Sequence, residues 1–400
     1  MLAFGFVWGT LHVGFFGRRE IVDVGAYKSY GDAVVDGRVP YRDFHVGYPP
    51  AALPVFIVPS VISSEHYRRV FEFIMLECGA AALGFAALTL RVVGAGLQRL
   101  VLAVAFVALA PLALGSVVLS RYDLWPAAIT AAALAALVSG RSRLALAVLA
   151  VAVAAKFYAL VLLPLALLFV ARQRGNREAL KAFTAFAVAL ALLTIPFLFG
   201  AHGLAQTGEA QATRSLQIES LGSSVLLVAH RLGAYAATVV SGPGSQNLAG
   251  GLPDLLANVT TVVQILAVVA VWLLYARGPA TRERLLVAAA AAVTGFVAFD
   301  RVLSPQYLVW LLPLVPLVAG RLGLAAAGVL LAGVLLTQAW FPQHYFDLVA
   351  LRGEIWLVLA RDLVLVGLYG LLVVGLWRSD VSAEPRRRII GAWPSSPTPS

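Results

Sequence analysis

LALAVLAVAVAAKFYALVLLPLALLFV, residues 144–170, is the stretch that decides how the chain crosses a membrane. Its 27 residues are too many for one ordinary membrane helix, which needs about 20, and too few for two full ones. Lys156 lies near the middle of the run. A single crossing would place the basic segment RQRGNREALK on the opposite side from the other basic loops. We therefore predict two short helices that meet around Lys156 as a hairpin.

The composition of the chain predicts a polytopic membrane protein around this hairpin. The mean hydropathy is +0.87 and only 12% of the 400 residues are charged, whereas a soluble domain has about 25%. Other apolar runs lie at roughly 1–16, 70–90, 100–118, 124–139, 182–199, 255–276, 285–299, 307–319, 323–340 and 356–377. Together with the hairpin they predict an all-α bundle of about twelve transmembrane helices.

The charges of the loops predict the orientation. The loops at one predicted side, with the tail, hold 16 lysine and arginine residues against 4 acidic ones, so we expect them in the cytoplasm. Both termini are then cytoplasmic, and residues 1–377 form a single integral membrane domain. Residues 378–400 form a basic, Pro/Ser-rich tail. The other basic residues are scattered between apolar runs, which argues against a nucleic-acid partner.

Two long loops lie on the predicted outer side, at residues 17–69 and 200–254, and we expect the function there. In the first, a helical pattern starts near Asp23 and stops at Asp36-Gly37. The proline-rich YPPAALPVFIVPS that follows is predicted to lie at the membrane interface. In the second, LGSSVLLVAHRLGAYAATVV is predicted to form a surface helix.

Polar residues cluster at the predicted outer ends of the helices. Ionisable groups at membrane depth are costly and usually face a cavity. Carboxylates and guanidinium groups together suit the binding of a lipid-linked phosphate beside a proton-accepting aspartate. The sequence holds no Walker A, GxGxxG, DxD or HExxH motif, and its one cysteine, Cys78, cannot build a paired-cysteine metal site.

One pattern resembles a known family. The run D-x3-Y-x9-G-x2-PYRDF-x3-YPP, with LQIESLGSS and VLSPQYLVWLLPL downstream, is similar to the polyprenol-phosphate-mannose-dependent α-mannosyltransferases of glycosyltransferase family 87, in the GT-C superfamily. The similarity extends from about residue 22 to residue 345. It implies a GT-C-type bundle in the plasma membrane with an extracytoplasmic active site. The implied partners are the lipid bilayer, a polyprenyl-phosphate-linked sugar donor, and a glycolipid or glycan acceptor.

The resemblance also implies residue roles. Asp23 matches the catalytic aspartate of the first outer loop and would take the proton of the acceptor hydroxyl in an inverting displacement. Related members carry histidines where this chain has Gln306 and Tyr307. We therefore expect Arg301, Arg121 or Lys156 to bind the donor phosphate instead. No cofactor is required, and a divalent metal is neither demanded nor excluded. The candidate substrate-binding residues are Tyr27, Asp43, Tyr48, Arg121, Asp123, Lys156, Arg214, Glu219, Arg301, Gln306, Tyr307 and His344.

Each assignment has an alternative interpretation. Asp23 could balance a helix dipole, and Asp43 could pair with Arg42 at the surface. Arg121 and Asp123 could form a structural ion pair, and Lys156 could extend to the lipid headgroups. Arg214 and Glu219 could merely keep a loop solvated. His344 and three tryptophans are expected in an interfacial belt: Trp125, Trp310 and Trp340.

Two alternative functions also fit the sequence. Twelve crossings are common in transporters and flippases, although those proteins usually place ionisable residues near the bilayer midplane. The collection of polar residues and long loops at one face favours an enzyme. A GT-C enzyme that uses another lipid-linked sugar, such as arabinose or glucose, fits the same residues.

Overall fold

The computed structural model describes residues 1–13, 21–198, 203–242 and 244–381, and the chain is 75% helical. Within these residues, seven helices are long and apolar enough to cross a membrane. They are α4 (Tyr67–Val92), α5 (Leu97–Leu114), η2 (Phe157–Leu162) continued by α9 (Leu163–Arg174), α10 (Asn176–Thr194) continued by η3 (Ile195–Phe197), α13 (Gly251–Arg277), α15 (Gly320–Trp340) and α17 (Ile355–Val381). The protein is therefore an all-α polytopic membrane protein.

Shorter helices complete the bundle. They are η1 (Pro50–Ala52) with α3 (Leu53–Ser63), α6 (Val117–Ser120), α7 (Leu124–Val138), α8 (Ser142–Ala155), α14 (Arg282–Ala298), η4 (Pro305–Trp310) and η5 (Val315–Leu317). The expected run 307–319 thus forms two 3₁₀ segments and not one regular helix. Pro305, Pro313 and Pro316 explain this, because each lacks the amide that a regular helix needs. The count of about twelve crossings stays a prediction.

The first helix is shorter than its apolar run suggests. α1 (Leu2–Thr10) has nine residues, which span about 14 Å at 1.5 Å per residue. This is roughly half of the hydrocarbon thickness of a bilayer. The end of the predicted run, residues 14–16, lies outside the described residues.

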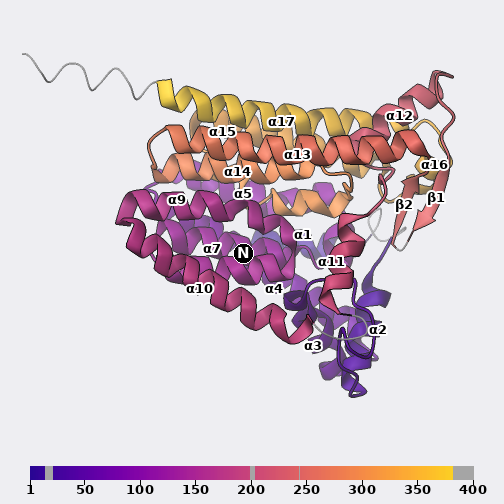
Figure 1. Cartoon of the computed structure of the whole chain (residues 1–400), viewed down its shortest axis with the longest axis horizontal. Helices are drawn as coiled ribbons and strands as arrows, with labels where there is room; N and C mark the ends of the chain where they lie inside the picture. The colour runs from indigo at the N-terminus through magenta and orange to yellow at the C-terminus, as the bar shows by residue number, and fades with distance from the viewer. Residues whose placement is uncertain (14–20, 199–202, 243, 382–400) are drawn as a thin grey trace, which may run out of the picture.

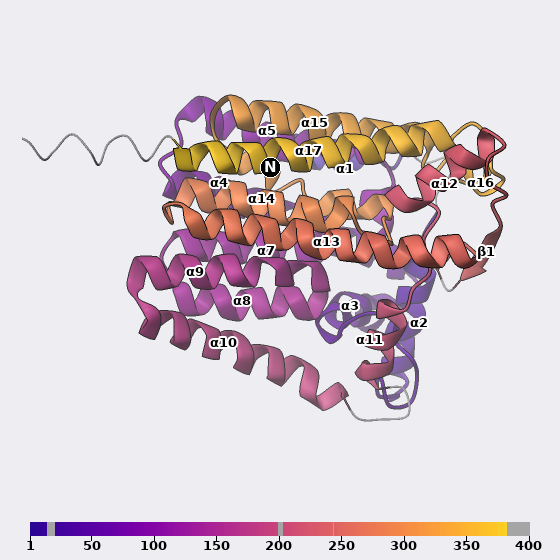
Figure 2. The ribbon, with the colours of Figure 1, turned by 45° about the horizontal axis from the view of Figure 1, so that its top comes forward.

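The predicted reversal of the chain at Lys156 is confirmed, but the second arm, Phe157–Arg174, is longer than predicted and could cross a membrane. α8 ends at Ala155, Lys156 has an extended backbone, and the chain returns through η2 and α9. The far ends of the two arms meet, because Gly140 lies against the guanidinium group of Arg174. α10 then packs against both arms, and Figure 2 shows these three helices side by side.

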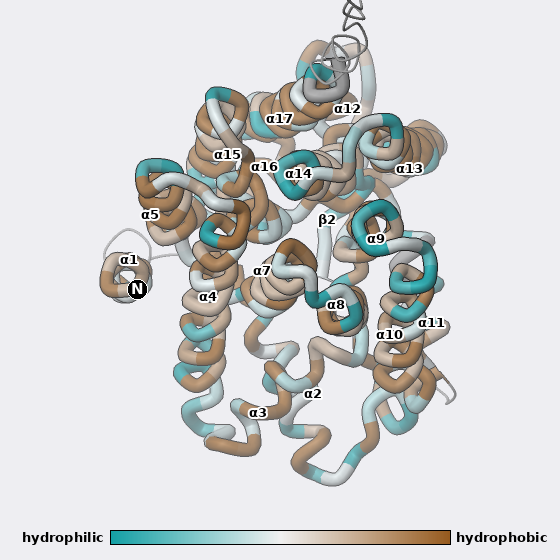
Figure 3. The backbone as a smooth tube through the Cα atoms, turned by 90° about the vertical axis from the view of Figure 1, so that its left-hand side faces the viewer, coloured by the Kyte–Doolittle hydropathy of each residue, from teal (hydrophilic) through white to brown (hydrophobic). Residues whose placement is uncertain are grey.

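The basic loops predicted to share a side do lie together at one end of the bundle. Arg99 pairs with Glu283 at 2.8 Å, and Arg172 Nη1 donates to the carbonyl of Gly278 at 2.6 Å. Arg143 pairs with Glu178 at 3.0 Å. Figure 3 looks onto this end, where hydrophilic segments cap α5, α8, α9 and α14. These contacts support the loop assignment on which the predicted orientation depends.

The opposite end carries elements of the two long loops together with α16 (Tyr345–Val349). The loop elements are α2 (Val24–Val35), α11 (Leu204–Ala212), α12 (Leu221–Arg231), β1 (Val239–Gly242) and β2 (Ser245–Leu248). Figure 1 shows them gathered at the end away from the C-terminus. The predicted surface helix over residues 221–240 is wrong in its second half, because α12 ends at Arg231 and the chain enters an antiparallel pair of strands. The break falls just before Gly233, whose φ is +75°.

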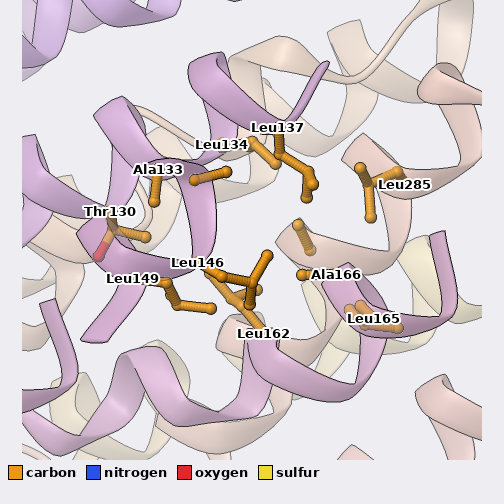
Figure 4. Close-up of a pocket in the computed structure, with 12 residues that line it drawn as sticks. Thr130, Ala133, Leu134, Leu137, Leu146, Leu149, Leu162, Leu165, Ala166 and Leu285 are labelled. Carbon is orange, nitrogen blue, oxygen red and sulfur yellow. The ribbon is translucent and has the colours of Figure 1, made fainter. Parts of the chain in front are cut away.

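One cavity lies within the bundle, away from the long loops. It measures about 20 Å³ and lies between α7, α8, α9 and α14 (Figure 4). Leucine and alanine side chains line it, with Thr130 as the one polar residue. An apolar void of this size offers no partners to a charged phosphate or a sugar. This cavity therefore does not fit either ligand.

Candidate functional site

The start of α2 places the first candidate residue. Asp23 is the N-cap residue of α2, and the buried Tyr27 follows one turn later on the same face. The predicted stop is also confirmed, since Asp36 is the C-cap residue and Gly37 adopts a φ of +85°. α2 therefore holds Asp23 and Tyr27 next to each other where the first long loop meets the bundle.

Asp23 forms an ion pair with Arg121. Its Oδ2 also accepts a hydrogen bond of 3.4 Å from the Tyr27 hydroxyl, and its side chain makes no capping bond to the amides of α2. Arg121 lies in the extended segment between α6 and α7, and its Nη2 donates to the carbonyl of Ile21 at 3.2 Å. The Asp23 side chain is 28% exposed and that of Arg121 only 9%. The carboxylate thus stays accessible while its partner is buried.

A second ion pair joins Asp123 to Lys156. Lys156 Nζ lies 2.7 Å from Asp123 Oδ1, which also accepts a hydrogen bond of 2.8 Å from Trp310 Nε1. The Asp123 side chain is 1% exposed. Arg121 and Asp123, which could have paired with each other, therefore pair with different partners.

Aromatic rings surround Lys156. Its Nζ lies 4.7 to 5.3 Å from the ring centroids of Tyr122, Tyr307 and Trp310, a range in which cation–π attraction is favourable. Its side chain is 17% exposed, so the interpretation that it extends to the headgroups is wrong. Trp310 and Trp340 are 2% and 0% exposed, which also contradicts their expected place in an interfacial belt.

Tyr27 and Tyr48 connect the two ion pairs. Their ring centroids lie 5.6 Å apart, and both rings pack edge-on against Tyr122, at 5.8 and 5.2 Å. Burial raises the pKa of Tyr48, so its hydroxyl stays protonated at neutral pH. The first long loop, residues 17–69, therefore supplies the Asp23 carboxylate and the neutral side chains of Tyr27 and Tyr48 to the same region as Lys156.

The second long loop, residues 200–254, reaches this region through Gln217 and Glu219. Gln217 Nε2 donates to Glu219 Oε2 at 2.6 Å and to Ser304 Oγ at 3.0 Å. The backbone amide of Gln217 donates a hydrogen bond of 3.0 Å to the backbone carbonyl of Arg301. Glu219 is 2% exposed, so the interpretation that it merely solvates a loop is wrong. These bonds tie the LQIESLGSS segment to the start of the SPQYL segment.

Two carboxyl groups here have raised pKa values. Burial raises the pKa of Glu219 to about 7, although Arg361 and Arg121 oppose the shift. Burial likewise raises the pKa of Asp300 to about 6, against the hydrogen bond from the Val302 amide. Both groups therefore titrate close to neutral pH.

We expect the raised pKa of Glu219 to make stability depend on pH. Between about pH 4.5 and pH 7 the folded protein keeps a proton that the unfolded chain has lost, so stability falls as the pH rises through this window. Across this window the free energy of unfolding falls by an amount on the order of 3 kcal/mol. Glu219→Gln should remove this pH dependence. From pH 5 to pH 8 the apparent melting temperature of the variant in detergent should therefore fall less than that of wild type. Parallel curves for the two proteins would contradict the assignment.

Arg214 and Arg301 differ from the other cations of the site. Among the described residues, neither guanidinium group lies within 4.0 Å of a carboxylate oxygen, whereas Arg121 and Lys156 each have such a partner. Arg301 Nη1 donates to the carbonyl of Arg214 at 3.3 Å, so the two residues are neighbours. Arg214 and Arg301 both act electrostatically on Asp300, and both arginines are partly exposed. Their guanidinium groups are therefore better placed than those of Arg121 and Lys156 to accept an additional anion.

A buried charged pair in α17 was missed by the sequence analysis, which treated residues 356–377 as a plain membrane span. Arg361 and Asp362 are both 0% exposed, and Arg361 Nε lies 2.8 Å from Asp362 Oδ1. Arg361 Nη2 donates to the carbonyl of Glu219 at 2.7 Å. The sequence does contain the signal, since two adjacent charges interrupt an otherwise apolar run.

His344 lies in a separate polar cluster beside α16. His344 Nδ1 is 3.2 Å from Asp347 Oδ2, and Arg352 Nη1 is 2.7 Å from Asp347 Oδ1. Atoms of His344, Asp347 and Glu354 that could bind a metal lie within 4.8 Å of one another. His344 and Arg352 together hold the pKa of Asp347 below its usual range. Asp347 thus already has its charge compensated.

The remaining candidates are less closely tied to this region. Asp43 pairs with Arg42 at 2.8 Å and accepts a hydrogen bond of 2.7 Å from the Val39 amide, as its surface-pair interpretation proposed. Gln306 lies in η4, next to Tyr307, and is partly exposed. Its role in substrate binding stays a prediction, as does that of Asp43.

A search against protein-family models found no match to the chain, and a search of curated proteins found none either. The resemblance to glycosyltransferase family 87 therefore stays an expectation. The function must be argued from the site itself.

Proposed function

We propose that the protein is a GT-C-type membrane glycosyltransferase with about twelve crossings. It moves a mannosyl or other hexosyl residue from a polyprenyl phosphate to a hydroxyl group of a lipid- or polysaccharide-linked acceptor. The observation that carries the proposal is that one end of the bundle, which bears both long loops, holds Asp23 with its buried partner Arg121 and also two guanidinium groups without a carboxylate partner among the described residues, those of Arg214 and Arg301. Arg214 also acts electrostatically on Lys156 of the same region. The charges of the opposite loops favour an extracytoplasmic position for this end.

The donor phosphate is best matched by Arg214 and Arg301. A guanidinium group binds phosphate oxygens through two parallel N–H bonds. This geometry suits a polyprenyl phosphate, which must leave the sugar as an anion. Arg121 and Lys156, which were also candidates, already neutralise Asp23 and Asp123. We therefore assign them to holding the two carboxylates in place, and assign phosphate binding to Arg214 and Arg301.

Asp23 would act as the general base. Its contacts with Tyr27 and Arg121 involve Oδ2, which leaves Oδ1 as the oxygen to take the proton of the acceptor hydroxyl. The acceptor oxygen forms a bond to the anomeric carbon while the bond from that carbon to the phosphate oxygen breaks, so the configuration inverts. One carboxylate suffices, because the phosphate leaves as a stabilised anion and needs no acid.

A transfer assay with the wild-type protein tests the function. Membranes from cells that express the chain are incubated with radiolabelled polyprenyl-phosphate mannose, and with the arabinose and glucose donors in parallel. We expect label to move from the mannose donor into an acceptor fraction. Movement from another donor alone would reassign the sugar. Movement of the intact donor across the bilayer without transfer would favour a flippase and contradict the proposal.

Replacing the unpaired arginines should weaken donor binding. Arg214→Gln and Arg301→Gln each remove a charged contact to phosphate, which is worth roughly 1.5–3 kcal/mol, so we expect the donor KM to rise about 10- to 100-fold. Initial rates over a range of donor concentrations measure this. Arg231→Gln, an exposed arginine at the end of α12, is the matched control and should leave KM unchanged. An unchanged KM in both test variants would remove the phosphate assignment.

A further inference from the structure

The side chain of Arg361 enters the candidate site from inside a membrane helix. It lies in the second turn of α17 with no exposed surface, and Asp362 beside it is equally buried. Burying two charges costs several kcal/mol even when they are paired, so such a pair makes a weak case for stability alone. Buried ionisable groups in membrane helices usually serve a function. The contacts of Arg361 indicate which one.

Arg361 contacts two partners through two different nitrogen atoms. Nη2 donates a hydrogen bond of 2.7 Å to the carbonyl of Glu219, whereas Nε lies 2.8 Å from Asp362 Oδ1 as an ion pair without hydrogen-bond geometry. The guanidinium carbon also lies 5.7 Å from the ring centroid of Trp340 in α15. Only a planar, forked side chain can meet all three groups at once, because lysine offers a single nitrogen atom.

The backbone that Arg361 holds belongs to the segment that carries the unpaired arginines. From Glu219 the bonds continue through Gln217 to Ser304 and to the carbonyl of Arg301. Arg301 in turn donates to the carbonyl of Arg214. Residues 214–220 also pair with β2, through the Ile218 amide and the carbonyl of Gln246 at 3.0 Å. Arg361 thus adds a charged hydrogen bond between this segment and α17, beside the buried apolar cluster that Leu216 and Ile218 share with α17.

We propose that Arg361 is a positioning residue that anchors residues 214–220 to the bundle and so sets the places of Arg214 and Arg301 in the candidate site. It touches neither donor nor acceptor. Its effect on sugar transfer rests on the proposed function, whereas its effect on the order of the segment does not.

Hydrogen exchange of the purified protein tests the anchoring directly. Arg361→Lys removes Nη2, the atom that donates to the carbonyl of Glu219, so we expect the backbone amides of Gln217 and Ile218 to exchange about 10-fold faster or more. The amides of α2 should exchange as in wild type, because no hydrogen bond or ion pair joins α2 to α17 within the part of the chain that the structure describes. Unchanged exchange at Gln217 and Ile218, or an equal increase throughout the protein, would overturn the proposal.

A second variant separates positioning from stability. Arg361→Met with Asp362→Leu removes both charges and leaves no buried ion unpaired, so its melting temperature should stay near that of wild type. We expect faster exchange at Gln217 and Ile218 all the same, and a donor KM raised about 10-fold with a smaller change in kcat. Wild-type exchange in this variant would make Arg361 a structural partner of Asp362 alone. If exchange increases but wild type shows no transferase activity, the anchoring stands and the proposed function fails.

Discussion

Sugar transfer by the Asp23→Asn variant is expected to be slower than that of wild type by roughly 10²- to 10⁴-fold, the usual contribution of a positioned general base. Asparagine has nearly the same shape and still accepts the hydrogen bond from Tyr27, but its amide oxygen cannot take a proton at neutral pH. The loss should fall on kcat, because Asp23 does not hold the donor phosphate. Initial rates at saturating donor, with protein amounts matched, measure the effect.

Asp36→Asn is the matched control for this prediction. Asp36 lies at the other end of α2, is exposed, and contacts none of the candidate site residues in the described structure. Its variant should keep the wild-type rate. If Asp23→Asn also keeps that rate, Asp23 is not the base, and its interpretation as a helix-terminal charge gains support.

Asp123→Ala is expected to destabilise the fold by roughly 3–5 kcal/mol, because it leaves Lys156 as an unpaired charge in the bundle. Trp310 Nε1 loses its acceptor in the same variant. The surrounding rings of Tyr122, Tyr307 and Trp310 attract the ammonium group but do not replace a carboxylate. The apparent melting temperature in detergent should therefore fall by several degrees or more, or the variant should not accumulate.

A double variant gives this prediction a sharper test. Asp123→Leu with Lys156→Met removes both charges and should restore most of the stability, as often happens when a buried ion pair becomes apolar. A single Asp123→Ala variant as stable as wild type would contradict the described pairing. So would a double variant less stable than Asp123→Ala.

Much of the architecture could be predicted because hydropathy and charge report it directly. The reversal of the chain at Lys156 followed from a 27-residue run and the charges next to it, and the structure confirms it. The short helix α2, with its stop at Asp36-Gly37, followed from spacing and a turn signal. The 3₁₀ segments near Trp310 and the strands after α12 were not predicted, because proline and glycine break helices in a way that average hydropathy conceals.

The pairing within the site could not be predicted, because it depends on backbone direction. Arg121 and Asp123 are two residues apart, yet the backbone changes from φ −121° and ψ 145° at Arg121 to φ −66° and ψ −19° at Asp123. The two side chains therefore leave the chain in different directions and find Asp23 and Lys156. Arg361 was missed for another reason, since one adjacent pair of opposite charges hardly changes the mean hydropathy of a long run.

The most direct test of the proposal is a single-turnover reaction of the purified protein in a bilayer, with radiolabelled polyprenyl-phosphate mannose in saturating amount and an acceptor fraction present. The measurement is the amount of label in the product and the anomeric configuration of its sugar. We expect wild type to transfer the label with inversion, and Asp23→Asn to bind the donor as tightly but to leave the label on the lipid. Transfer with retention, or a wild-type rate in Asp23→Asn, would contradict the assignment of Asp23 as the base.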